Sequence, residues 1–546
     1  MLVAEAVGRA LVACGVDHVF GVVGSGNFHV TNAMVDAGAR FVATRHEAGG
    51  ATAADGYART SGRPAAVTLH QGCGFTNALT GITEAAKSRT PLVVVAAEVR
   101  EPRSNFFVDQ EAMARAVGAV PHRVTSAAEA VAQAVAAVAE AVHGRRTVVL
   151  NLPLTVQGEE VADDALGSVA LPPAPPGVAP SASDVDRLVA ALSAAERPVF
   201  VVGRGGRSAG ARDALRTLGE RSGALLATSA VARGLFSADP WQLDVSGGFS
   251  SPLTAELVSD ADLIVGWGCA LNMWTMRHGR LIGPGTTVVQ VDDTPDALGA
   301  HRDLAFGVVG DVAVTARAVT DALGAPRTAY RSPAVRDRLA RELRWRDVPF
   351  EDVSGAGRID PRTLSIALDD LLPAQRVVAV DSGNFMGYPS MFLQVPDEQG
   401  FCFTQAFQSV GLGLATAIGA ALARPDRLPV AALGDGGALM GASELETLVR
   451  LGLPMLVVVY DDEAYGAEVH HFGPDGHDLS TVRFPPTDLA AVGRGFGMES
   501  VTVRSPEDLD AVRAWVASGP TGPMLVQAKV TRDEPAWWLE EAFRGH

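Results

Sequence analysis

Gly434-Asp435-Gly436-Gly437 stands between an apolar run at residues 428–433 and a helix-like run at 438–451. A second apolar run, 455–460, is rich in β-branched residues and leads into Asp461-Asp462. The order strand, helix, strand predicts a right-handed crossover that returns the second strand parallel to the first. We therefore predict a βαβ unit and an α/β fold.

The two acidic positions of this unit indicate a ligand site. Asp435 and Asp462 would both follow parallel strands, at the edge where open α/β sheets bind ligands. A hard divalent cation takes oxygen ligands and bridges to phosphate oxygens, while amides at the start of a helix favour the anion. A lone Gly-Asp-Gly-Gly is more often an ordinary turn, but this arrangement favours a site for a metal and a diphosphate.

This segment resembles the motif of thiamine-diphosphate enzymes that binds the diphosphate and magnesium, and which runs from Gly-Asp-Gly to a paired Asn. The resemblance implies that Asp435, Asp462 and the backbone carbonyl of Ala464 coordinate Mg²⁺. It also implies that Gly434, Asp435, Gly436 and Gly437 bind thiamine diphosphate. Here the closing pair is Asp461-Asp462, and an Asp in place of Asn adds a negative charge to the metal site.

Residues 44–62 and 74–95, which read TRHEAGGATAADGYARTSG and GFTNALTGITEAAKSRTPLVVV, resemble the pyrimidine-binding domain of acetolactate synthase and its relatives. In that family the residue matching Glu47 hydrogen-bonds a ring nitrogen of the cofactor's aminopyrimidine. A carboxyl group buried against an apolar ring has a raised pKa and could exchange a proton with that nitrogen near neutral pH. The alternative is a glutamate in the first turn of a helix, expected at 48–60 after a strand at 40–44, that the helix dipole favours.

Composition is that of a large enzyme. The chain of 546 residues is long enough for three domains, and 47% hydrophobic with 20% charged residues is globular composition. The net charge of −17 argues against nucleic acid and anionic membranes as partners. Since no apolar run is long enough to span a membrane and the first residues lack a signal-peptide core, we expect a cytoplasmic protein. Four scattered cysteines indicate reduced thiols.

Three doubly wound parallel-sheet domains are expected, at residues 1–167, 184–324 and 355–546. The resemblance identifies them as pyrimidine-binding, central and diphosphate-binding domains. The Pro-rich segment 168–183 would link the first two, and 325–360, with a connecting helix at 332–347, would precede the third. Strand-like runs in the central domain are 198–202, 263–266 and 287–291.

Several other positions carry over from acetolactate synthase. Val410 matches a larger apolar residue that supports the bent cofactor. Glu444-Leu445 matches part of a Gln-Glu-Leu stretch on the helix after the glycine turn. Gln110 matches a Gln that points toward the active site, although a solvated loop amide is an equal alternative. Ser382, Gly383 and Asn384 occupy the strand-end loop that contacts the diphosphate.

The departures from that family concern the substrate pocket. Gln71-Gly72-Cys73-Gly74 replaces Ser-Gly-Pro-Gly, so His70 and Gln71 could move protons or simply cap a strand. His471, beside His470 and near Glu468, replaces a Trp of the second-substrate pocket, and could act on substrate or lie on the surface.

Those synthases also hold FAD in the central domain. Here Gly203-Arg204-Gly205-Gly206 follows a strand and could receive a phosphate, but it is not a Gly-x-Gly-x-x-Gly fingerprint. Residues 268–274 also differ from the Arg-containing stretch of the synthases. FAD stays open but is disfavoured, and thiamine diphosphate with Mg²⁺ is the expected cofactor set.

The resemblance implies decarboxylation of a pyruvate-like 2-keto acid, followed by carboligation of the remaining unit to a second carbonyl. A decarboxylase that does not ligate, or another specialised thiamine-diphosphate lyase, is the alternative. A nucleotide-dependent oxidoreductase would need a dinucleotide fingerprint, which is missing. A non-catalytic regulatory or assembly homologue would be expected to lack Glu47 or the metal acids, which are present. In this family the two cofactor ends lie on different subunits, so Glu47 and Asp435 would meet across the interface of a homodimer or tetramer.

Overall fold

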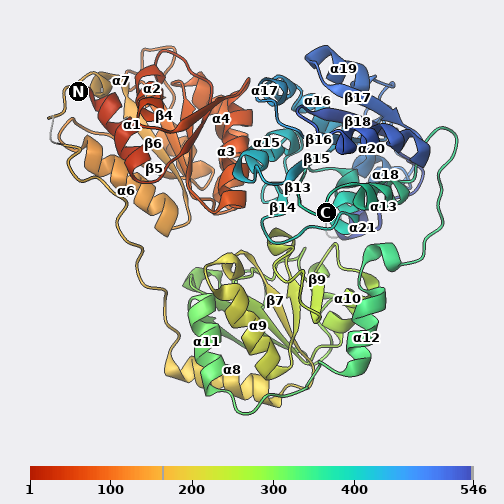
Figure 1. Ribbon diagram of the computed structural model, residues 1–546. Helices are drawn as coiled ribbons and strands as arrows, with labels where there is room; N and C mark the ends of the chain where they lie inside the picture. Colours follow the sequence, from red (N-terminus) through yellow and green to blue (C-terminus); the bar gives the residue numbers. More distant parts are fainter. Residues whose placement is uncertain (163–164, 543–546) are drawn as a thin grey trace.

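The computed structural model describes residues 1–162 and 165–542, which form three six-stranded sheets (Figure 1). Every pairing between neighbouring strands of these sheets is parallel. Helices cover both faces of each sheet, as the doubly wound α/β prediction requires. The predicted fold class is therefore confirmed, while the domain boundaries stay predictions.

The N-terminal sheet has the order β2-β1-β3-β4-β6-β5. Its strands are β1 (His18–Gly21), β2 (Arg40–Ala43), β3 (Ala65–Leu69), β4 (Leu92–Glu98), β5 (Val120–Arg123) and β6 (Thr147–Pro153). Alternate side chains of a strand face opposite sides, so Val93 and Val95 of β4 pack under one helix layer and Val94 under the other. The first layer contains α1 (Val3–Ala13), α2 (Phe28–Asp36) and α6 (Ala130–His143), and the second α3 (Glu47–Ser61) and α4 (Cys73–Lys87).

The central sheet has the order β12-β11-β10-β7-β8-β9. Its strands are β7 (Pro198–Val202), β8 (Leu225–Thr228), β9 (Gln242–Val245), β10 (Leu263–Trp267), β11 (Thr287–Asp292) and β12 (Phe306–Val309). One face packs against α8 (Ala182–Ala194), α9 (Ala211–Ser222) and α11 (Val312–Ala322), the other against α10 (Pro252–Ser259) and α12 (Pro333–Glu342). The predicted strands at 198–202, 263–266 and 287–291 are confirmed as β7, β10 and β11.

The C-terminal sheet has the order β14-β13-β15-β16-β18-β17. Its strands are β13 (Arg376–Val380), β14 (Phe401–Phe403), β15 (Leu428–Gly434), β16 (Leu456–Asp461), β17 (Glu499–Val503) and β18 (Met524–Lys529). One face packs against α13 (Pro361–Leu371), α14 (Gly387–Phe392), α20 (Asp510–Ala517) and α21 (Trp537–Ala542). The other packs against α15 (Gly413–Ala423), α17 (Glu444–Arg450) and α19 (Leu489–Phe496).

The N-terminal and C-terminal domains share one hydrophobic core, in which α3 crosses α15 (Figure 1). Glycines allow the two helix backbones to approach closely. A Cβ at Gly56 would lie 2.5 Å from the Thr416 carbonyl oxygen, and one at Gly419 would overlap the Ala53 carbonyl oxygen. The two outer domains are thus fixed against each other within one chain.

Two predicted helices are observed in a different form. The helix expected at 438–451 is two helices, α16 (Asp435–Met440) and α17, because the chain leaves helical geometry at Gly441. The connecting helix expected at 332–347 is α12, capped by Ser332, followed by a separate 3₁₀ turn at Trp345–Asp347. Arg344, which is extended, separates these two elements.

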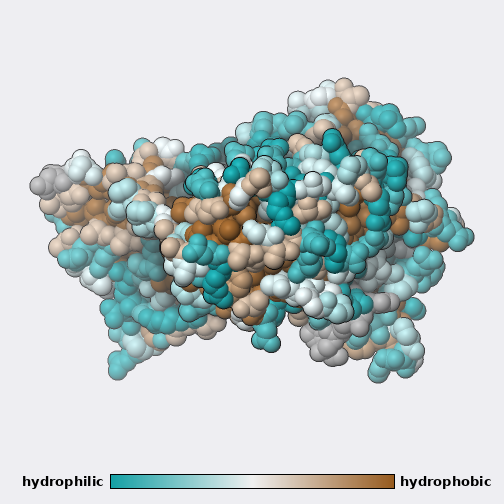
Figure 2. Space-filling view, turned by 90° about the horizontal axis from the view of Figure 1, so that it is seen from below, coloured by the Kyte–Doolittle hydropathy of each residue, from teal (hydrophilic) through white to brown (hydrophobic). Residues whose placement is uncertain are grey.

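The linker predicted at 168–183 forms no helix or strand between 168 and 181, and α8 begins at Ala182. Seen from below, apolar surface gathers near the middle of the molecule, among mostly hydrophilic side chains (Figure 2). None of the described helices is long and apolar enough to cross a membrane.

Candidate active site

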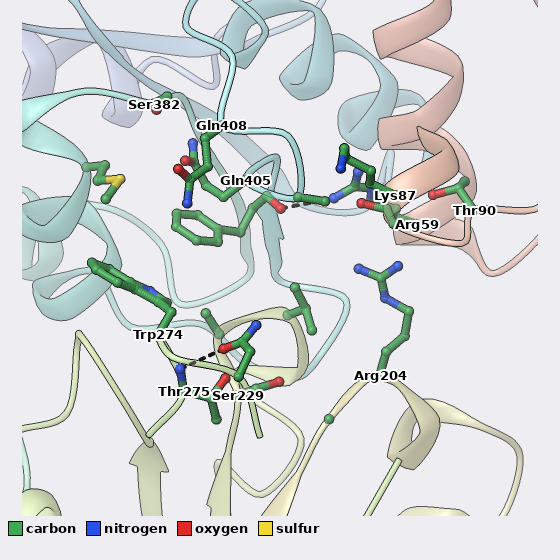
Figure 3. A pocket seen from close by; sticks show the side chains of 18 of the residues that line it. Arg59, Lys87, Thr90, Arg204, Ser229, Trp274, Thr275, Ser382, Gln405 and Gln408 are labelled. Carbon is green, nitrogen blue, oxygen red and sulfur yellow. Dashed lines mark hydrogen bonds between the residues drawn. The ribbon is translucent and has the colours of Figure 1, made fainter. Parts of the chain in front are cut away.

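A cavity of about 1500 Å³ opens where the three domains meet. It is lined by residues of each domain, among them Lys87, Arg204 and Ser382 (Figure 3). Arg204 follows β7 and extends toward Arg59 and Lys87 (Figure 3). Burial, and then the nearby guanidinium groups of Arg59 and Arg207, lower the pKa of Arg204 to about 9. A cationic wall of this kind favours an anionic group in the cavity.

Asp435 and Asp462 both line this cavity. β15 and β16 are neighbours in the sheet, and each acid follows the end of its strand. Burial, followed by the charges of Asp462 and Asp461, raises the pKa of Asp435 to about 7. Burial also raises the pKa of Asp462 to about 6. Two largely desolvated carboxylates, close enough for the charge of Asp462 to raise the pKa of Asp435, are a favourable place for a cation.

The surrounding groups fit a divalent cation with oxygen ligands. The Asn384 amide donates a hydrogen bond of 3.2 Å to Asp462, and the buried Oδ1 of Asn384 has no hydrogen-bond partner. A Cβ at Gly466 would overlap the Asp462 carboxylate, so glycine keeps this space open. Within the described residues no cluster of three or more His, Cys, Asp or Glu could hold a metal alone. Further ligands would have to come from backbone carbonyls, such as that of Ala464, and from a bound diphosphate.

The two aspartates of the pair 461–462 have different surroundings. Asp461 is buried and accepts hydrogen bonds of 2.7 Å from Lys529 and 2.6 Å from Gln527. Asp462 lines the cavity, whereas Asp461 does not. Glu463, between Asp462 and Ala464, adopts a left-handed φ of 59° and forms an ion pair of 3.1 Å with Lys529. Sequence reasoning missed Lys529, although it is one of only two lysines in the chain.

Asp381 organises the other side of the same site, and sequence reasoning missed it. Its buried carboxylate accepts hydrogen bonds from the N–H groups of Ser382 (2.8 Å), Gly411 (3.0 Å) and Leu412 (3.2 Å). Val410 directly precedes Gly411 and Leu412, is 39% exposed and lines the cavity. Burial raises the pKa of Asp381 to about 6. A strand-end acid before Ser-Gly is the only sequence signal that could have singled out Asp381.

The glycines around Asp381 and Asp435 keep the backbone close to the cavity. A Cβ at Gly437 would overlap the Asp381 carboxylate. Gly383 has a φ of 139°, which side-chain-bearing residues rarely adopt. Gly434 and Gly436 also line the cavity. We call Asp435, Asp462, Asn384, Ser382 and Val410, with these glycines, the C-terminal half-site.

A second group of predicted residues gathers in the N-terminal domain. Glu47 is the first residue of α3 and accepts a hydrogen bond of 3.0 Å from Asn77, which sequence reasoning missed. His70 follows β3 and accepts a hydrogen bond of 3.3 Å from the Gly26 N–H. A Cβ at Gly74 would lie 3.5 Å from Glu47 Oε1 and 3.2 Å from His70 Cβ. Glu47 and His70 therefore both lie next to the space that a side chain at Gly74 would occupy.

Gln71 and Gln110, two further predicted residues of the N-terminal domain, have buried side chains. Gln71 is 5% exposed, and its side-chain oxygen has no hydrogen-bond partner. Gln110 is 1% exposed, which excludes a solvated loop amide. It accepts a hydrogen bond of 3.2 Å from the Gly72 N–H and donates one of 2.9 Å to Asn151. We call Glu47, Asn77, His70, Gln71 and Gln110 the N-terminal half-site.

The fold of one chain does not bring these two half-sites into one cavity. No residue of the N-terminal half-site lines the cavity that contains Asp435, Asp462 and Val410. His471, on α18 (Gly466–Phe472), also lies outside its lining, whereas Glu468 of the same helix lies within it. The His471 ring packs edge-on against Phe472, with 4.6 Å between ring centroids.

Three family models of the thiamine pyrophosphate enzymes match the chain. The N-terminal TPP-binding domain matches residues 1–116, the central domain 185–319 and the C-terminal TPP-binding domain 381–528. These matches include Glu47, Asp435 and Asp462.

The chain is also similar to curated proteins over almost its whole length. An acetolactate synthase large subunit of Parasynechococcus marenigrum is 27% identical and covers 97% of this chain and 88% of its own. A sulfoacetaldehyde acetyltransferase of Rhodobacter capsulatus is 27% identical, with 100% and 96% covered. A probable 2-ketoarginine decarboxylase of Pseudomonas aeruginosa is 30% identical, with 94% and 91% covered.

Among solved structures, a thiamine diphosphate-dependent 4-hydroxybenzoylformate decarboxylase of Rhodococcus jostii shares the fold. Its TM-score is 0.82 at 23% identity, and the alignment covers 98% of this chain and 100% of that one. Family models, curated relatives and fold agree across all three domains. The chain belongs to the thiamine pyrophosphate enzyme family.

Proposed function

We propose that this protein decarboxylates a pyruvate-like 2-keto acid and ligates the remaining unit to a second carbonyl, using thiamine diphosphate and Mg²⁺. The observation that carries the proposal is the pair of carboxylates, Asp435 and the buried Asp462, that line one large cavity. Similarity to an acetolactate synthase and a sulfoacetaldehyde acetyltransferase supports transfer to an acceptor. Simple decarboxylation is the second candidate, favoured by the similarity to a probable 2-ketoarginine decarboxylase.

In this proposal the C-terminal half-site binds the cofactor's charged end. Asp435, Asp462 and the Ala464 carbonyl hold Mg²⁺, and Asn384 orients Asp462 through its amide. The glycine turn after β15 offers backbone amides to the diphosphate. Val410, fixed through its neighbour's bond to Asp381, supports the cofactor from below. When bound, thiamine diphosphate supplies a thiazolium carbon that adds to the keto carbonyl and accepts the electron pair released as carbon dioxide leaves.

The N-terminal half-site handles protons. Glu47 exchanges a proton with a ring nitrogen of the aminopyrimidine, and Asn77 holds the other side of its carboxyl group. His70 lies beside the same glycine, Gly74, and is placed to give or take a proton from the substrate. Gln71 orients the substrate, while Gln110 fixes the turn at Gly72. We propose that His471 contacts the acceptor substrate.

These assignments require two chains, because one chain keeps its half-sites apart. We propose a homodimer, or a tetramer built from it, in which Glu47 of one subunit acts on the cofactor held by the partner. Apolar side chains that are exposed in the single chain, such as Phe28 (51%) and Leu439 (48%), are available for burial against a partner. Burial of such surface would exclude water from the completed site.

The test is turnover of pyruvate by apoprotein supplied with thiamine diphosphate, Mg²⁺, both or neither. Carbon dioxide together with a ligated product, formed only with both, supports carboligation. Carbon dioxide with acetaldehyde alone supports the decarboxylase. Glu47→Gln is expected to lower either rate at least about 100-fold. If 2-keto acids of several sizes all fail with both cofactors bound, the proposal is wrong.

We do not expect FAD to bind in addition to thiamine diphosphate and Mg²⁺. The cationic wall around Arg204 can receive a phosphate, but this is not specific for a flavin. The visible absorption spectrum of the purified protein decides the matter. We expect no flavin band, and a stoichiometric band would add FAD to the proposal.

A further inference from the structure

Glu444 reaches out of its own domain to hold the backbone that leads into Glu47. It is the first residue of α17 in the C-terminal domain and is 3% exposed. Its carboxylate accepts hydrogen bonds from the N–H groups of Arg45 (3.1 Å) and His46 (3.0 Å) in the N-terminal domain. Arg45 and His46 directly precede Glu47.

The fit around this carboxylate is tight. A Cβ at Gly49, in the first turn of α3, would overlap Glu444 Oε1, so the loop and helix rest directly on it. Thr447 donates a hydrogen bond of 2.6 Å to the other oxygen and fixes the side chain from behind. Hydrogen bonds to a buried, ionised acceptor are about twice as strong as neutral ones. The position of Glu47 is therefore set by a residue of another domain.

A second, weaker contact ties the same loop to the same helix. The Arg45 side chain forms hydrogen bonds of 2.6 and 2.5 Å to Glu446, but the Arg45 side chain is 55% exposed and that of Glu446 is 29% exposed. Water screens exposed pairs, and most contribute little. Glu446 therefore serves as a matched control two residues from Glu444, since it touches the loop without holding its backbone.

A short segment of chain, from Asp435 to Glu444, connects the C-terminal half-site with the loop that precedes Glu47. Asp435 begins α16 at the C-terminal half-site, and Glu444 begins α17 at the Glu47 loop. Glu47 does not line the cavity that contains Asp435 of its own chain. In the proposed dimer, Asp435 and the Glu47 loop of one chain therefore belong to different active sites. Residues 441–443 connect α16 directly to α17.

We propose that Glu444 is a positioning residue that fixes Glu47 and so ties one chain's cofactor site to the glutamate that the same chain lends to its partner. This inference rests on the proposed function. It assigns Glu444 an effect on cofactor activation that is separate from cofactor binding. The residue acts through the backbone of Arg45 and His46 and touches no reacting atom.

The test compares Glu444→Gln with Glu446→Gln in the cofactor-loaded protein. A Gln side chain keeps one oxygen for the N–H groups of Arg45 and His46, but it removes the negative charge and places an amide donor where Thr447 now donates. We expect Glu444→Gln to bind thiamine diphosphate with Mg²⁺ within about threefold of wild type, because the C-terminal half-site is intact. Exchange of the cofactor's thiazolium C2 proton with deuterium, quenched in acid and read by NMR without substrate, should slow at least about tenfold. Glu446→Gln should change both values less than about twofold.

Equal exchange rates in Glu444→Gln and wild type, or equal losses in both variants, would overturn the inference. If Glu444→Gln does not fold, Gly49→Ala disturbs the same contact from the N-terminal side and should give the same slow exchange with intact binding. A wild-type protein that binds no thiamine diphosphate would refute the proposed function itself. Wild-type binding with fast exchange, unaffected by either substitution, would refute only the role of Glu444.

Discussion

At the scale of single residues, the acid pair 461–462 shows how neighbours in sequence acquire different roles. Both are aspartates at a strand end, but Lys529 neutralises Asp461 inside the sheet, and Asp462 faces the cavity. The positions of Asp435 and Asp462 could be predicted because strand, turn and strand leave a readable pattern. Asp381 and Asn77 could not, since their roles depend on backbone amides and a carboxylate that only the fold brings near.

Because Asp462 faces the cavity and Asp461 pairs with Lys529, we expect Asp462→Asn to weaken Mg²⁺ binding and Asp461→Asn to lower stability. Asp462→Asn removes one of two anionic ligands, so the Mg²⁺ concentration for half-maximal binding of thiamine diphosphate should rise about tenfold. Asp461→Asn should leave that concentration nearly unchanged but lower the thermal midpoint by about 3–6 °C, because Lys529 loses its shorter ion pair. Mg²⁺ titrations and melting curves of both variants test this. A stable Asp461→Asn with weak Mg²⁺ binding would contradict the assignment.

Asp381 predicts a pH dependence of stability. Its pKa is about 6 in the folded chain, above the ordinary aspartate value of 3.8, so folding favours the protonated form. This favourable contribution is complete below the unfolded pKa and is lost as pH rises through the folded pKa, a change of roughly 3 kcal/mol at most. Asp381→Asn cannot ionise. Its thermal midpoint relative to wild type, measured on apoprotein, should therefore increase between about pH 5 and about pH 7. A difference that is flat or falls with pH would contradict this.

At the scale of elements, strands were easier to predict than helix breaks. The runs at 428–433 and 455–460 form β15 and β16 because buried parallel strands need continuous apolar sequence. The helical pattern at 438–451 is also continuous, yet the chain breaks at Gly441. That break starts α17 at Glu444, where the carboxylate meets Arg45 and His46. Local periodicity does not record this contact between distant segments.

The crossing of α3 and α15 predicts that glycine is required at Gly419. An added methyl group would overlap the Ala53 carbonyl oxygen, and backbone cannot move aside cheaply. Gly419→Ala should destabilise the protein by about 2–3 kcal/mol or prevent the outer domains from packing. Gly495, in α19, has no atom within 4 Å of an added Cβ and is the control. Gly495→Ala should leave the thermal midpoint unchanged or raise it slightly. Equal effects in the two variants would show that the crossing tolerates side chains.

At the scale of the whole molecule, the sequence predicts most residues of both half-sites, but it does not show how one chain separates them. The motifs identify both ends of the cofactor site, and the resemblance implies that they meet across subunits. Within one chain, the shared core of α3 and α15 fixes the two outer domains, and Glu47 stays outside the cavity of Asp435. Since rigid packing prevents closure within a chain, a second copy is the simplest source of the missing half.

Complementation between subunits tests this arrangement. One chain carries Glu47→Gln and the other Asp435→Asn, with different affinity tags, and the mixed dimer is purified after co-expression. If active sites form across the interface, one site receives both defects and the other none, so the mixed dimer should recover about half of wild-type activity. Sites formed within single chains would each carry one defect, and the mixed dimer would be as inactive as either variant alone. Failure to isolate any mixed dimer would argue against a dimer altogether. Thiamine-diphosphate binding at one site per dimer, measured by calorimetry, is expected in either arrangement, because Asp435→Asn removes a metal ligand only from its own chain; recovered turnover is therefore the result that separates the two arrangements.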